Sequence, residues 1–151
     1  MRKLIAIMAL AISTSLVVGC APSQQMQDAR KKDAEFSQAV KNINLETANA
    51  GNKPSDYKSI VEEAIREQLK DPDSAKFSSF TNPRKEVMVE NGSFVYGYST
   101  CLYVNAKNSY GGYTGKELYW VFLRDNKVLR IKNTNEAYGN MIFVGRSINC
   151  N

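Results

Sequence analysis

The spacing of hydrophobic residues changes near residue 77. Before this point, apolar side chains recur at the three- and four-residue spacing of one helix face, and they are Tyr57, Ile60, Val61, Ala64, Ile65 and Leu69. After it, apolar and polar residues alternate with the period of two that is typical of a half-buried strand. The two patterns predict one helix followed by a series of strands.

Two starts fit the predicted helix. Ser55 or Asp56 is suited to cap its N-terminus, whereas Ser59 with Glu62 fits a capping box one turn later. The helix is expected to end at 70–72, because the residue before Pro72 disfavours helical backbone. A short turn over 72–75, capped by Asp71, follows.

The alternating region predicts an antiparallel sheet. Asn91-Gly92 is the strongest two-residue hairpin signal, Asp125-Asn126 indicates a second turn, and Gly97 suggests a bulge. The expected strands are 77–81, 84–90, 93–105, 117–124, 127–132 and 141–144. The predicted fold is α+β, an N-terminal helix packed on an antiparallel sheet of four to five strands.

Three regions are expected along the chain: 1–19, a signal peptide; 20–54, a polar tether; and 55–151, the folded domain. Within the tether, apolar residues at helical spacing predict a marginal amphipathic helix over 24–44, interrupted by Asp33, and 45–54 is expected to be a linker. The stripe of Phe36, Val40 and Ile43 either pairs with a partner or belongs to a simple spacer.

The N-terminus has the pattern of an export signal. Arg2 and Lys3 precede an apolar run to Val18, which is shorter than the roughly 20 residues of a spanning helix. The run ends in Leu16-Val17-Val18-Gly19-Cys20, which resembles the bacterial lipobox. An ordinary secreted protein with a cysteine near its cleavage site is the alternative.

The lipobox resemblance implies lipidation of Cys20, with acyl chains such as palmitate, and cleavage before it. Several chains hold a protein firmly on a membrane, whereas one binds only marginally. Residue 21 is Ala rather than the Asp that retains lipoproteins in the inner membrane. The resemblance therefore implies a lipoprotein of the cell envelope, on the outer membrane and facing the periplasm if the host is diderm.

The remaining cysteines, Cys101 and Cys150, lie 49 positions apart. Two cysteines in an exported chain predict one disulfide, which pins the C-terminus to a strand near the middle of the domain. Two buried free thiols are the alternative.

Composition argues against several functions. The formal net charge is +5, of which Arg2 and Lys3 contribute two, and no basic stripe suggests nucleic-acid binding. Histidine is absent, which excludes Ser-His-Asp and Cys-His catalysis, and no cofactor or metal site is expected. Asp71 and Asp73 lack the ligand number of a calcium site. We therefore expect no enzyme; Glu86, Glu90 and Glu117 are the candidate acids for the alternative, a hydrolase.

One segment has the composition of a recognition loop. Asn105–Gly115 is rich in Gly, Asn and Tyr, a composition common in binding loops on rigid sheets. The candidate binding residues are Asn105, Lys107, Asn108, Tyr110 and Tyr113. The alternative is a long hairpin loop whose rings pack inward.

Two motifs of the domain resemble a known pattern. Asp71-Pro72-Asp73-Ser74-Ala75-Lys76-Phe77 and the C-x-x-VNAKNSYGGYTG run from Cys101 are similar to a pattern in small, mostly uncharacterised exported and mobile-element bacterial proteins. The resemblance covers about 57–125 and implies no activity.

We expect a non-enzymatic envelope lipoprotein that binds a protein partner or serves as an accessory subunit. An inhibitor of a wall-degrading enzyme such as lysozyme is the first alternative, and a small-ligand binder or hydrolase the second.

Overall fold

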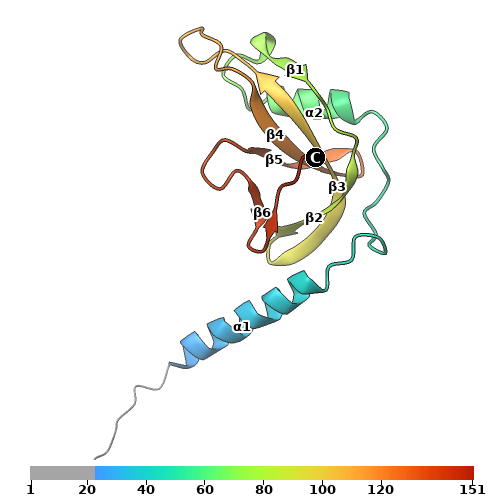
Figure 1. Ribbon diagram of the computed structural model, residues 1–151, viewed down its shortest axis with the longest axis vertical. Helices are drawn as coiled ribbons and strands as arrows, with labels where there is room; N and C mark the ends of the chain where they lie inside the picture. Colours follow the sequence, from blue (N-terminus) through green and yellow to red (C-terminus); the bar gives the residue numbers. More distant parts are fainter. Residues whose placement is uncertain (1–22) are drawn as a thin grey trace, which may run out of the picture. The chain divides into compact units, whose positions relative to one another are not determined.

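The fold is α+β, as the sequence predicts (Figure 1). The structure is a computed structural model that describes residues 23–151, so the lipobox and Cys20 lie outside the described residues. The described elements are α1 (Gln24–Lys41), α2 (Tyr57–Arg66), the 3-10 turn η1 (Pro72–Ser74), β1 (Lys76–Ser78), β2 (Arg84–Glu90), β3 (Ser93–Asn105), β4 (Glu117–Arg124), β5 (Lys127–Asn133), β6 (Met141–Phe143) and β7 (Arg146–Ser147).

The chain divides into two units between Phe36 and Ser37, which are described separately. Most of α1 belongs to the first unit. It begins after Ser23, whose hydroxyl accepts a hydrogen bond from the Met26 N–H at 3.4 Å, and none of its residues is fully buried. Within residues 23–151, no helix has the length and apolar character needed to cross a membrane.

The second helix is shorter than expected. It covers Tyr57–Arg66, and the chain leaves it in tight turns in which Gln68 and Leu69 donate to backbone carbonyls three residues earlier. Asp56 occupies the cap position, which confirms the earlier of the two predicted starts, although its side chain makes no capping bond; the later start at Ser59 is wrong. By contrast, Asp71 caps η1 as predicted, accepting from the Ser74 N–H at 3.3 Å.

The main sheet is antiparallel and is built around β3. One edge of β3 pairs with β2 along its first half and with β1 at its end, and the other edge pairs with β4, which pairs in turn with β5. Thr81 bridges the gap between β1 and β2: its N–H donates to the Cys101 carbonyl, and its hydroxyl accepts from the Cys101 N–H, both at 2.8 Å.

Both predicted two-residue turns are present. Asn91 and Gly92 have φ values of 49° and 75°, and Asp125 and Asn126 have 50° and 59°. Positive φ at both central residues is the type I′ geometry that matches the twist of the adjoining strands. Local turn chemistry therefore explains why β2 ends, β3 begins and β4 ends at the expected residues.

Each face of the sheet has its own apolar cluster. The apolar stripe of α2 packs with Leu102, Val104, Val121 and Leu123 on one face. Met88, Cys101, Trp120 and Phe122 form the cluster on the other face, against which Ile142, Ile148 and Cys150 of the C-terminal segment pack. The sheet is thus covered on both faces, by α2 on one and by the C-terminal segment on the other.

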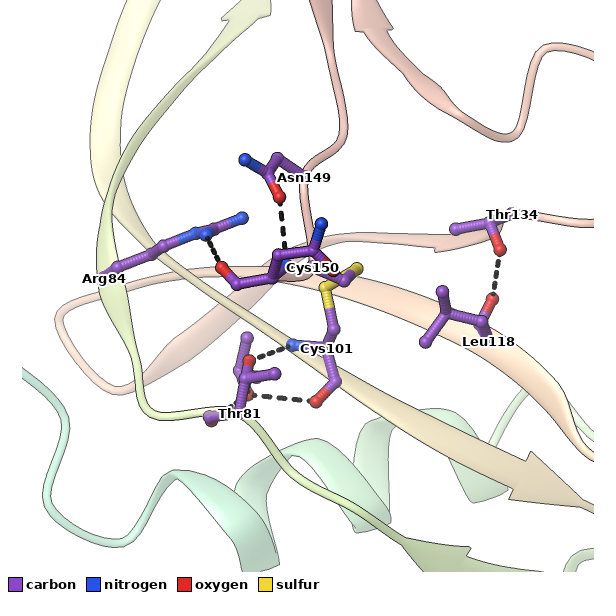
Figure 2. Close-up of a disulfide and its surroundings, with 9 residues drawn as sticks. Thr81, Arg84, Cys101, Leu118, Thr134, Asn149 and Cys150 are labelled. Atoms are coloured by element: carbon purple, nitrogen blue, oxygen red, sulfur yellow. Dashed lines mark hydrogen bonds between the residues drawn. A yellow bond between two sulfur atoms is a disulfide. The ribbon is translucent and has the colours of Figure 1, made fainter.

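A disulfide joins Cys101 to Cys150, confirming the predicted pairing, with Cα atoms 5.7 Å apart (Figure 2). Cys101 lies on the central strand and is 2% exposed. The tail is also held by Arg84, which donates to the Asn151 carbonyl at 2.7 Å. The two-stranded hairpin of β6 and β7 lies just before this attachment, and β7 is a strand that the sequence did not predict.

Gly97 does not form the expected bulge. The register of β2 and β3 runs unbroken past Glu86 opposite Gly97, and the irregularity lies instead between β4 and β5, at Phe122/Leu123. Gly97 is needed for another reason. A Cβ atom there would collide with the Leu123 carbonyl oxygen and the Phe122 ring.

The segment expected to be a linker is fixed to the domain. Lys85 donates to the Glu46 carbonyl at 2.9 Å, and Arg124 donates to the Asn49 carbonyl at 3.2 Å. Ala50 and Pro54 are buried. The folded unit therefore begins before residue 55.

Candidate functional site

The Asn105–Gly115 loop is a small hairpin held by its own backbone. Lys107 and Tyr113 face each other across an isolated antiparallel bridge. Within it, the Asn108 N–H donates to the Gly112 carbonyl at 2.8 Å, and the Gly111 N–H donates back to the Asn108 carbonyl at 3.0 Å. Figure 1 shows the loop, in orange, projecting beyond the ends of β3 and β4.

Two of the predicted binding residues stabilise this hairpin. The Asn108 side-chain oxygen accepts from the N–H groups of Tyr110, at 2.9 Å, and Gly112, at 3.1 Å. The Asn105 side-chain oxygen accepts from the Gly115 N–H at 3.2 Å. Asparagine commonly satisfies loop backbone in this way. Both side-chain oxygens are therefore used to fix the loop.

The loop is also attached to η1. The Lys107 N–H donates to the Ser74 hydroxyl at 2.9 Å, and that hydroxyl donates to the Asp71 carbonyl at 2.8 Å. Arg66, at the end of α2, donates to the Pro72 carbonyl in the same turn. A chain of hydrogen bonds thus connects α2, η1 and the loop, which limits the movement of the loop base.

The two loop tyrosines occupy different environments. Tyr110, at the tip, is 96% exposed. Tyr113 is 44% exposed, and the Nζ atoms of Lys76 and Lys107 lie 4.6 Å and 5.6 Å from its ring centroid. Neither ring belongs to the core clusters, contrary to the alternative in which both pack inward.

Lys76 is a member of this group that the sequence analysis did not identify. It reaches Tyr113 because β1 pairs with β3 in a register that sets Lys76 opposite Asn105. Nothing in the local sequence indicates that contact, since it depends on a long-range strand pairing. The structure thus brings Lys76, Lys107 and Tyr113 together and leaves Tyr110 separate at the tip.

Of the three acidic residues named for hydrolysis, two are bound by other side chains and the third is exposed. Glu86 is 5% exposed and accepts from the Arg146 guanidinium at 2.5 Å and from the Val87 N–H at 2.9 Å. Glu117 accepts from the Asn133 side-chain amide at 2.6 Å. Glu86 lies opposite Gly97 and Glu117 opposite Val104, at different levels of β3. Glu90 lies at the end of β2 and is exposed.

The remaining surface of the described residues does not present a clear ligand or metal site. A depression of about 460 Å³ beside α2 is lined mainly by the polar outer face of the helix, with Glu62, Glu63, Glu67 and Arg66. Among the residues that the structure describes, no three Cys, Asp or Glu side chains gather as they would around a metal ion. Comparisons with protein-family models, curated proteins and solved structures gave no match.

Proposed function

We propose that this protein is a lipid-anchored component of the cell envelope, facing the periplasm, that binds a protein partner through the Asn105–Gly115 loop and is not an enzyme. The anchor is inferred from the lipobox resemblance at Cys20. A partner rather than a small substrate is favoured because the candidate residues stand on a projecting loop.

A single observation carries the binding proposal. The Tyr110 ring is 96% exposed, although the backbone that carries it is held by hydrogen bonds. An aromatic ring on fixed backbone loses little conformational entropy on binding, and buried tyrosines are frequent anchors of protein interfaces. Removing the ring is expected to change binding and to leave the fold intact.

The experiment is a crosslinking pull-down from intact envelopes with the lipidated protein. Tyr110→Ala is expected to weaken association with the recovered partner by about 2 kcal/mol, as for an interface anchor, with no change in melting temperature. Tyr138→Ala is the matched control, because Tyr138 is another exposed tyrosine, at 79%, outside the loop. Equal partner recovery by the two variants would contradict the proposal.

Inhibition of a wall-degrading enzyme is the second candidate. It is favoured by the projecting shape of the loop, which suits insertion into an active-site cleft, and by the lysines at its base. The mature protein would then reduce the rate of cell-wall lysis by lysozyme, and Tyr110→Ala would relieve the inhibition. Unchanged lysozyme activity at a large molar excess of the protein would eliminate this candidate.

A further inference from the structure

Two lysine ammonium groups converge on one tyrosine ring at the base of the loop. Lys76 comes from β1 and Lys107 from the loop, and their Nζ atoms lie 4.6 Å and 5.6 Å from the Tyr113 ring centroid. The face of an aromatic ring attracts a cation with about 0.5–1 kcal/mol at exposed sites. The Tyr113 ring is therefore in contact with both cations.

Neither cation has a counter-ion in residues 23–151. The ion pairs of that part of the chain join Lys31 to Glu35, Arg124 to Asp125 and Arg146 to Glu86. Two like charges near one ring repel each other, and a single ring does not neutralise them. An anion that contacts both ammonium groups would offset that repulsion.

The backbone of the loop distinguishes between kinds of anion. Phosphate sites commonly use unpaired backbone N–H groups as a cradle. Here the N–H groups of Tyr110, Gly111 and Gly112 all donate to Asn108. Those of Thr114 and Gly115 donate to Ala106 and Asn105. With these N–H groups engaged, the two ammonium groups are the donors left for an anion, and the two oxygens of one carboxylate can accept from both.

We propose that Lys76 and Lys107 bind an aspartate or glutamate side chain of the protein partner, beside the Tyr113 ring. This inference rests on the proposed function, and it adds the chemistry of the partner: an acidic surface residue next to a site that receives the Tyr110 ring. Because Lys76 is exposed and Tyr113 is 44% exposed, the attraction to the carboxylate weakens as salt increases.

Zero-length carbodiimide crosslinking in intact envelopes tests the inference directly, because it joins an amine only to a carboxylate in contact with it. The expected product is an amide bond between Lys76 or Lys107 and an Asp or Glu of one protein, identified by mass spectrometry. A photoreactive residue at position 110, used in parallel, should label the same protein. Label at position 110 without any amide at the two lysines would overturn the inference and leave the proposed function standing.

A charge-neutralised variant provides the quantitative arm. Lys76→Gln with Lys107→Gln should weaken binding of that partner about tenfold at low salt and melt no lower than the natural protein. Lys58→Gln with Lys127→Gln removes the same charge elsewhere, with Lys58 also beside an aromatic ring, Phe80, and should bind normally. Equal weakening in both variants would overturn the inference. It would also be overturned if Lys76→Gln with Lys107→Gln lost binding only to vesicles of anionic phospholipid and bound the partner normally. No label at position 110 would instead contradict the proposed function.

Discussion

Gly97 shows how closely β3 and β4 approach each other. The position where a Cβ would stand is occupied by the Leu123 carbonyl oxygen and the Phe122 ring. Both neighbours are buried in the sheet, so neither can move away without disturbing the core. The absence of a side chain is therefore a packing requirement of this strand pair.

We expect Gly97→Ala to lower the free energy of unfolding by about 1–3 kcal/mol, the usual cost of overpacking, as measured by chemical denaturation. Gly112→Ala is the control, because a Cβ there would meet only the Asn108 side chain, at 3.8 Å and 3.9 Å. Equal free energies of unfolding for the two variants would contradict this expectation, because they would show that β3 and β4 can move apart at Gly97 without loss of stability.

Tyr119 is a second residue whose environment has a measurable consequence. Burial raises the pKa of its phenol above the ordinary value of about 10, the charges of Glu117 and Glu136 raise it further, and a hydrogen bond with Asn133 lowers it. The folded state therefore holds the phenol proton more tightly than the unfolded state does.

The corresponding stabilisation is complete below the unfolded pKa of about 10 and is lost as the pH rises through the folded pKa. We expect the free energy of unfolding to fall more steeply in the natural protein than in Tyr119→Phe between the unfolded and the folded pKa of this phenol. Denaturation curves at a series of alkaline pH values measure this difference. Parallel pH profiles for the two proteins would show that the phenol titrates alike in both states.

At the scale of elements, the C-terminal segment is held on the sheet by several separate contacts. The disulfide joins Cys150 to β3, Arg84 binds the terminal carbonyl, and the Glu86–Arg146 ion pair connects β7 to β2. This segment covers the cluster that contains Trp120. Releasing it would expose apolar surface of the sheet.

We expect Cys101→Ala with Cys150→Ala to lower the free energy of unfolding by about 2–4 kcal/mol, the usual range for a disulfide. Amide exchange should accelerate first in 148–151 and then in the β6–β7 hairpin. Reductant added to the natural protein should have the same effect. Unchanged stability after confirmed reduction would mean that the noncovalent contacts alone hold the segment.

For the whole molecule, the decisive expectation is the anchor at Cys20. Cys20→Ser should prevent lipidation and leave an uncleaved precursor, because the thiol is the acceptor that the lipobox resemblance implies. Mass spectrometry of membrane fractions measures both effects. The matched control is Cys101→Ser with Cys150→Ser, which removes two cysteines and should leave the lipid in place. Normal processing of Cys20→Ser would contradict the lipoprotein interpretation.

Several features of the fold follow from local sequence. The bounds of β2, β3 and β4 could be predicted because alternation and two turns with positive φ act over a few residues. The Cys101–Cys150 pairing followed from counting cysteines. The position of the candidate loop followed from glycine and asparagine between two apolar strands. Apart from the disulfide, which follows from the number of cysteines, these are properties that neighbouring residues determine among themselves.

Other features required the tertiary structure, because they depend on residues far apart in the chain. The pairing of β1 with β3 alone brings Lys76 to Tyr113. Folding of residues 46–54 onto the domain depends on donors supplied by Lys85 and Arg124, and the short strand β7 is connected to β2 by Glu86. Periodicity reports which face of an element is apolar, whereas long-range packing determines what covers that face and which charges meet.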